Sequence, residues 1–275
     1  MIQYFILSII QGVTEFIPVS SSGHLVLLHK FFGASDASIS FDILLHLATA
    51  LSLTVFLRKE ISNILKDLIC ALRDISGKAE IRQVWRKYDN LRLFGVICIA
   101  FLFTAVIALP LKNLAEEAFN SLKLTGIGFL ITAFALFLTR RRDFKRKLKD
   151  LTPLDAIIVG AVQGIAVFPG ISRSGLTISA GLLRGMDNNS AARVSFLISL
   201  PTILAAAAYK FKSGPDFTGY NLKLLIPSFL IAFLCGYLAL IVLSRLINKG
   251  RLYRFSYYCA FLGVSTIALS FIKQI

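Results

Sequence analysis

Residues 11–24 read QGVTEFIPVSSSGH, and residues 163–175 read QGIAVFPGISRSG. The two stretches share one frame without a gap, and the matching positions are Gln11 and Gln163, Gly12 and Gly164, Phe16 and Phe168, Ser20 and Ser172, Ser22 and Ser174, and Gly23 and Gly175. They differ in chemistry, because the first has Glu15, Ser21 and His24 where the second has Val167, Arg173 and Leu176. One copy carries an acid, a hydroxyl and an imidazole, and the other carries a fixed cation.

The composition of the chain indicates a membrane protein. Of its 275 residues, 56% are hydrophobic and only 16% are charged, which is typical of polytopic membrane proteins. The net charge of +15 does not indicate nucleic-acid binding, since the basic residues gather in short segments between apolar runs. The cysteines are far apart in the sequence and suggest neither a disulfide framework nor a zinc site.

The lengths of the apolar runs predict an all-α polytopic membrane protein with six transmembrane helices and two re-entrant helix pairs. The runs that flank the two motifs are short or interrupted, and an eight-residue return cannot cross a hydrocarbon core of roughly 30 Å. Irregular backbone at that depth is tolerated where it lines a cavity. The predicted re-entrant pairs are residues 4–17 with 25–32 and 154–168 with 176–183; the predicted spans are residues 41–57, 91–109, 122–139, 194–209, 222–246 and 255–272.

Loop charge predicts the orientation of these elements. The connectors rich in Lys and Arg are residues 58–87, 140–149 and 245–254, and such loops stay on the cytoplasmic side. Both termini are then expected on the periplasmic side, and the two halves are inverted in the membrane, with the site at their interface. The expected units are a first repeat (1–139), a basic cytoplasmic linker (140–152) and a second repeat (153–275). The alternative is that every short segment crosses the bilayer, so that the halves run parallel.

The first motif carries a carboxylate with two possible roles. Gln11 and Glu15 are four residues apart and share one helix face. Ionisable groups inside the bilayer persist mainly where they pair, line a pathway or do chemistry. Glu15 is therefore expected either to pair with Arg173 and hold the halves together, or to bind a divalent cation, Mg²⁺ or Ca²⁺, which prefers hard oxygen ligands.

The two serine turns are expected to bind an anion. Serine caps helix starts and glycine allows close backbone approach, so each turn can present amides to a phosphate. The residues expected to do so are Ser20, Ser22 and Gly23 in one turn and Ser172, Ser174 and Gly175 in the other, with Gln11 beside them. Arg173 adds a planar fork that matches phosphate oxygens, and His24 titrates in a range that suits proton transfer.

These two motifs resemble the signature motifs of the undecaprenyl-diphosphate phosphatase family, the bacitracin-resistance proteins. The resemblance covers essentially the full length, including SFLISLP at residues 195–201. It implies an integral inner-membrane enzyme that removes the terminal phosphate of undecaprenyl diphosphate and so recycles the lipid carrier of cell-wall synthesis. The family motifs fall on Gln11 and Glu15, on Ser21 and His24, and on Arg173. Gln11 stands where many members have Glu, and His46 stands where others often carry Gln. With Asp42 four residues earlier, His46 is expected either to orient a group in the site or to bond across helices, and the sequence leaves this open.

The expected mechanism binds the diphosphate through Arg173 and the turn amides, with charge neutralised by a cation held partly by Glu15. Ser21 attacks phosphorus with His24 as proton shuttle, or His24 activates water, or His24 is itself phosphorylated; the sequence leaves these open. The active site is expected to open to the periplasm, and a homodimer is a reasonable assembly. The competing class is a lipid-phosphate flippase or secondary transporter that uses the same inverted-repeat site.

Overall fold

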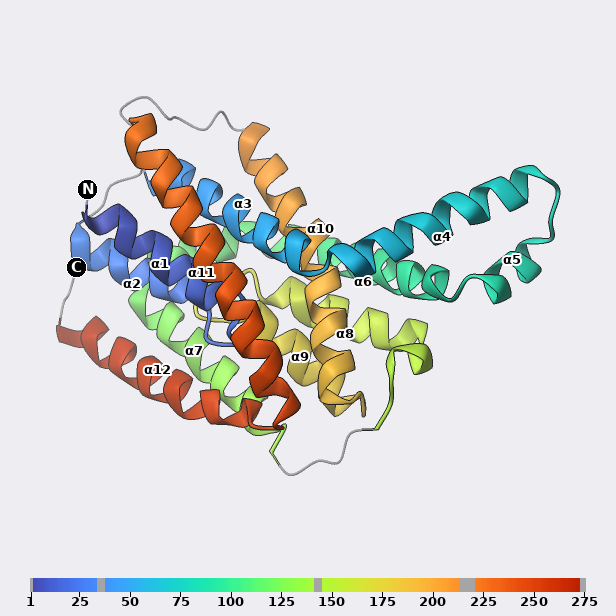
Figure 1. Ribbon diagram of the computed structural model, residues 1–275. Helices are drawn as coiled ribbons and strands as arrows, with labels where there is room; N and C mark the ends of the chain where they lie inside the picture. The colour runs from blue at the N-terminus through green and yellow to red at the C-terminus, as the bar shows by residue number, and fades with distance from the viewer. Residues whose placement is uncertain (1, 34–37, 141–144, 213–220, 273–275) are drawn as a thin grey trace.

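The computed structural model describes residues 2–33, 38–140, 145–212 and 221–272, and their regular secondary structure is almost entirely helical. These residues form twelve α-helices and two short 3-10 helices, and the sole β-type pairing among them is an isolated bridge between Arg146 and Met186. The all-α prediction is confirmed. Figure 1 shows a bundle of helices from which one helical arm, made by α4, α5 and the start of α6, projects to the side.

The long apolar helices fall on the predicted spans. Four are long and apolar enough to cross a bilayer by themselves: α6 (Asp89–Phe119), α10 (Asn188–Lys212), α11 (Leu222–Asn248) and α12 (Phe255–Ile272). A fifth, α3 (Ser38–Phe56), passes the same test together with α4 (Arg58–Ser76), from which it is bent by 73°. The sixth, α7 (Leu122–Phe137), is apolar but has only 16 residues.

Each motif lies between two short helices. The first pair is α1 (Ile2–Phe16) and α2 (Ser21–Phe32), and the second is α8 (Pro153–Ile165) and α9 (Arg173–Leu183). The longest of the four has 15 residues, whereas a bilayer span needs about 20. The helix–break–helix form is therefore as predicted, while the depth and orientation of these pairs in a membrane stay predictions.

The two halves exchange equivalent contacts. Helix α1 packs against α11, and its counterpart α8 packs against α6. The matching glycines make both contacts close, since an added Cβ at Gly12 would lie 2.7 Å from the carbonyl oxygen of Ala232, and one at Gly164 would lie 2.9 Å from that of Thr104. This exchange is what a pseudo-twofold relation produces; the domain boundaries given above stay predictions.

Helices α7 and α12 hold corresponding places in the two halves, and they lie side by side (Figure 1). A Cβ built on Gly126 would lie 2.9 Å from the carbonyl oxygen of Gly263, and one built on Gly263 would lie 2.9 Å from that of Gly126. The contact is thus reciprocal, and small residues allow the two backbones to approach closely.

The tips of the two helix pairs meet in the interior. A Cβ on Gly23, in the first turn, would lie 2.9 Å from the Cα of Gly170, just before the second turn. Gly170 has φ +84°, a conformation that glycine adopts without strain. On the other side of the tips, Phe16 packs edge-on against Phe196, and both belong to the largest buried core. The fold therefore places the two motifs against each other.

Candidate functional site

Glu15, in the last turn of α1, is the centre of a buried polar network. Its Oε1 accepts a hydrogen bond from Nη2 of Arg173 at 2.6 Å, and its Oε2 accepts from Oγ of Ser21 at 2.7 Å and from Nε2 of Gln11 at 2.9 Å. The side chain is only 5% exposed. Three donors from α1, α2 and α9 converge on one carboxylate, which is satisfied only in its ionised form.

The two serine turns have the same internal hydrogen bonds. Ser20 caps α2 and accepts from the amide of Gly23 at 3.3 Å, and Ser172 caps α9 and accepts from the amide of Gly175 at 3.1 Å. In each turn the capping hydroxyl also lies near the hydroxyl of the serine two residues later. The distance is 3.2 Å from Ser20 to Ser22 and 3.3 Å from Ser172 to Ser174. Each cap satisfies one amide and leaves other amides at the helix start, where an anion is favoured.

Arg173 connects the two motifs. It is the first residue of α9, and its side chain is 16% exposed. Its Nη1 donates to the carbonyl oxygen of Ser199 at 3.4 Å. A pair with Arg173 is one of the two roles that the sequence analysis gives to Glu15. The structure brings it to Glu15, and through Glu15 to Ser21.

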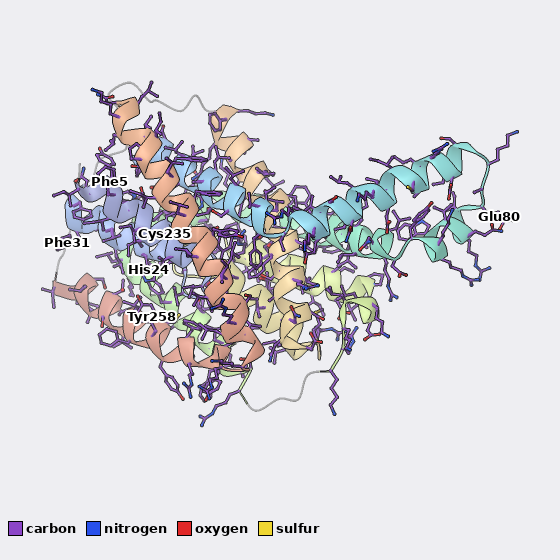
Figure 2. All side chains as sticks on the ribbon, viewed as in Figure 1. Phe5, His24, Phe31, Glu80, Cys235 and Tyr258 are labelled. Carbon is purple, nitrogen blue, oxygen red and sulfur yellow. The ribbon has the colours of Figure 1, made fainter. Side chains whose placement is uncertain are left out.

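His24 has partners other than Ser21. Its Nδ1 lies 2.7 Å from the carbonyl oxygen of Ser20 and so donates to it, and its Nε2 then accepts from the hydroxyl of Tyr258 on α12 at 2.8 Å. Its ring also stacks on that of Tyr258 and meets Phe129 edge-on, on the side of the bundle where α7 and α12 pack (Figure 2). Within the described residues neither ring nitrogen is bonded to Ser21, so the expected shuttle between them stays a prediction.

His46, on α3, lies beside this network, whereas the sequence leaves open whether it orients a group in the site or only bonds across helices. Its Nδ1 lies 2.9 Å from Nε2 of Gln11 and 3.5 Å from Oε2 of Glu15, and its side chain is 30% exposed. The signal that could have found it is an ionisable residue inside a predicted span, which marks a site by default. Asp42, one turn earlier, does not join it, because that carboxylate pairs with His29 at 3.1 Å.

The second motif has no charged counterpart of this network. Gln163, which matches Gln11, donates to the hydroxyls of Thr104 at 3.0 Å and Thr202 at 2.9 Å. Both partners are neutral, and Val167 occupies the position that matches Glu15. The carboxylate and its imidazole neighbour therefore belong to one half alone, as the two motifs predict.

The residues around Glu15 fit a divalent cation only if it is shared with a phosphate. The described residues contain no group of three or more His, Cys, Asp or Glu side chains placed to hold a metal ion. However, Oε1 of Gln11 is buried without a hydrogen-bond partner beside the carboxylate. One carboxylate with neutral oxygens nearby suits Mg²⁺, which commonly takes one or two carboxylates and completes its shell with water and substrate phosphate.

Comparison with known proteins gives one consistent result. The family model described as "Bacitracin resistance protein BacA" matches residues 4–265. An undecaprenyl-diphosphatase of Desulforapulum autotrophicum is 39% identical over 98% of this chain and 98% of its own length. Proteins with the same name from Carboxydothermus hydrogenoformans and Methanosphaera stadtmanae are 41% and 35% identical, each over at least 96% of both chains.

Proposed function

The chain belongs to the family of bacitracin resistance protein BacA, and from that membership we propose that it is a membrane phosphatase that hydrolyses undecaprenyl diphosphate to undecaprenyl phosphate and inorganic phosphate. The observation that carries the proposal is the contact between the two turns at Glu15, which holds the guanidinium of Arg173 on one oxygen and the hydroxyl of Ser21 on the other. A nucleophile, its proton acceptor and a phosphate-binding fork thus occupy one buried place.

Binding of the diphosphate is assigned to Arg173 and to the free amides of the two turns. A guanidinium binds phosphate oxygens through two parallel hydrogen bonds, and helix starts favour negative charge. Since Arg173 is paired with Glu15, an incoming phosphate competes with that carboxylate for the guanidinium. The same event leaves Glu15 with a weaker counter-charge and makes it a better proton acceptor.

Ser21 is the nucleophile that the geometry favours. Its Oγ already donates to Oε2 of Glu15 at 2.7 Å, which is the reach that a general base needs. In the proposed step the bond from Oγ to the terminal phosphorus forms, and the bond from phosphorus to the bridging oxygen breaks. Undecaprenyl phosphate leaves, and the serine proton moves to Glu15. Water then cleaves the phosphoserine: the bond from phosphorus to Oγ breaks, the water oxygen and its protons leave with inorganic phosphate, and Glu15 returns its proton to Oγ.

His24 keeps a role in proton transfer within this proposal. It follows Ser21 by three residues on α2, so the two side chains share one face of the helix. Direct attack by its ring is disfavoured, because both ring nitrogens are engaged, one by Ser20 and the other by Tyr258.

A divalent cation, Mg²⁺ or Ca²⁺, remains part of the proposal. Glu15 and the unpartnered Oε1 of Gln11 would hold it together with the substrate phosphate. When bound, it would neutralise charge on the phosphate oxygens. Removal by a chelator is expected to weaken phosphate release, with recovery on adding back either ion.

The placement in the cell is proposed from the basic connectors. They put both termini and the opening of the site on the periplasmic side of the inner membrane. A homodimer stays part of the proposal. Labelling of single cysteines introduced near each terminus, in intact cells with a membrane-impermeant reagent, tests the orientation, and absence of labelling would reverse it.

The decisive experiment is phosphate release from undecaprenyl diphosphate by the detergent-purified chain. Ser21→Ala is expected to abolish release, whereas Ser8→Ala removes a hydroxyl that bonds only within its own helix and is expected to leave it unchanged. Mapping of trapped phosphate to Ser21 supports the covalent route, mapping to His24 overturns it, and no label indicates direct attack by water. A wild-type chain that moves the lipid between leaflets without releasing phosphate would favour the flippase.

A further inference from the structure

The arm formed by residues 58–90 is a structural unit outside the site. It consists of α4, α5 (Ile81–Lys87) and the first residues of α6, with Glu80 near its tip in Figure 2. It has a small core of its own, in which Ala71, Val84 and Leu91 are buried. Asp74 closes the far end, accepting from Lys87 at 2.7 Å and from Tyr88 at 2.9 Å. The arm is therefore a folded element with a defined outer surface.

Helix α4 has a second apolar face that this core does not use. Leu65, Ile69 and Leu72 follow one another at helical spacing and are 51%, 66% and 57% exposed. On α5, Ile81 and Trp85 are one turn apart and are 62% and 50% exposed. Large apolar side chains exposed together on one face of a structured helix indicate a partner.

Basic side chains border this surface. The arm has eight basic residues, Arg58, Lys59, Lys66, Arg73, Lys78, Arg82, Arg86 and Lys87, against five acidic residues, Glu60, Asp67, Asp74, Glu80 and Asp89. Asp74 accepts from Lys87, and Glu60 lies 3.8 Å from Arg193, whereas Asp67 accepts from the neutral amide of Asn90 at 2.9 Å. Because basic residues outnumber acidic ones by eight to five, the net charge of the arm is positive.

The arm also connects two helices, α3 and α6, that are candidates for crossing the bilayer. Helix α4 begins two residues after the end of α3 and turns away from it by 73°, and α6 leads back from the arm as the longest apolar helix. If α3 crosses the bilayer close to its normal, this bend makes α4 run nearly parallel to the membrane surface. Apolar residues with a basic border and an aromatic ring are the composition of helices that lie in the interface.

We propose that the arm lies on the cytoplasmic leaflet, with its exposed apolar residues at the boundary of the acyl chains and its basic residues on the phosphates of anionic lipids. Charge complementarity selects this occupant. A second copy of the chain would place the same basic border against itself, whereas a leaflet with anionic lipids offers negative charge along the whole arm. The surface anchors the end of α3, the helix that carries His46.

Trp85 is a built-in probe, because it is the only tryptophan in the chain. The full-length protein is reconstituted into vesicles of phosphatidylcholine, with or without phosphatidylglycerol, that contain lipids brominated at defined depths. The expected result is strong quenching of Trp85 by bromines near the headgroup and weak quenching by bromines at the bilayer centre. Absence of quenching would place the arm in water, and strongest quenching by the deepest bromines would place it inside the core; either result overturns the proposal.

A charge-reversal variant tests the lipid partner. Lys66→Glu with Arg73→Glu is expected to reduce the extra quenching that phosphatidylglycerol gives by about twofold or more. Lys123→Glu, at the start of α7 and outside the arm, is the matched control and is expected to change nothing. Phosphate release in detergent reports that each variant is folded. Trp85 fluorescence that depends on protein-to-lipid ratio but not on lipid charge would assign the surface to a second copy and overturn the proposal.

Discussion

The ion pair between Glu15 and Arg173 joins the two halves, and its removal has a calculable consequence. Glu15→Gln keeps the shape of the side chain but removes its charge. The carboxylate accepts hydrogen bonds from Arg173, Ser21 and Gln11 on its two oxygens. A carboxamide has only one oxygen, and its NH2 group would face one of these donors in place of the second oxygen. The guanidinium, only 16% exposed, is then left without a counter-charge.

The magnitude follows from the burial of both partners. Breaking a buried ion pair by removing one partner costs about 3–5 kcal/mol, mostly because a charge is left uncompensated. Glu15→Gln and Arg173→Gln are each expected to cost that much stability. The double variant leaves no unpaired charge, so its cost is expected to fall short of the sum of the singles by about 2 kcal/mol or more.

Activity is expected to behave differently from stability. If the pair only fastens the halves together, the double variant recovers stability and phosphate release in parallel, each to the extent that the unpaired charge caused the loss. If Arg173 binds the phosphate and Glu15 accepts the proton of Ser21, the double variant recovers stability but not phosphate release. This divergence separates a structural role from a functional one.

The assay compares four proteins, the wild type, both singles and the double, by thermal unfolding of the detergent-purified chain and by phosphate release. Glu117→Gln, an exposed carboxylate near the end of α6, serves as the control and is expected to match the wild type in both. Additive losses of stability would refute the reasoning on the buried pair. Recovered phosphate release in the double variant would refute the roles given to both residues.

Three further substitutions have defined outcomes. Arg173→Lys keeps the charge but loses the fork, and kcat/KM for phosphate release is expected to fall about tenfold or more, since a hydrogen bond to a charged group contributes about 1.5–3 kcal/mol; near-wild-type turnover would exclude bidentate binding. Tyr258→Phe keeps the stacked ring but frees Nε2 of His24, and is expected to shift the ¹⁵N resonances of that ring alone among the three histidines; unchanged spectra would contradict the contact. Gly170→Ala puts a methyl group against the α7 backbone at φ +84° and is expected to prevent folding, whereas Gly33→Ala at φ +63° meets nothing within 4 Å and costs only about 1–2 kcal/mol of strain; equal yields of folded protein would refute the clash.

The sequence predicts the helices well where hydrophobic length decides them, and less well at their ends. The predicted span at residues 91–109 stops before Pro110, yet α6 continues through that proline to Phe119. Proline disfavours a helical residue before it, but here the later turns pack Ala115 and Ala118 into the interior, and that burial outweighs the local preference. Helix α10 begins at Asn188, earlier than predicted, because Asp187 accepts from the amide of Ser190 at 2.7 Å and caps it.

The sequence predicts the site only in part, because motifs report neighbours along the chain. The residues of both turns, with Glu15 and Arg173, are found in the two matching frames. His46 and Tyr258 are not, since they reach Gln11 and His24 across 35 and 234 residues. Helical periodicity tells which side chains share a face but not which faces meet. Such contacts need the fold.

The contacts between the halves explain why the shared frame and the differing residues coexist. Gly12 and Gly164 each lie against a backbone carbonyl of the other half, so neither position tolerates a larger side chain without a shift. At the positions of Glu15, Ser21 and His24 the second copy carries different residues, Val167, Arg173 and Leu176. A guanidinium and a carboxylate on opposite turns pair only because those turns touch at Gly23 and Gly170. The close backbone contacts thus hold a symmetric scaffold on which an asymmetric pair of charges can form.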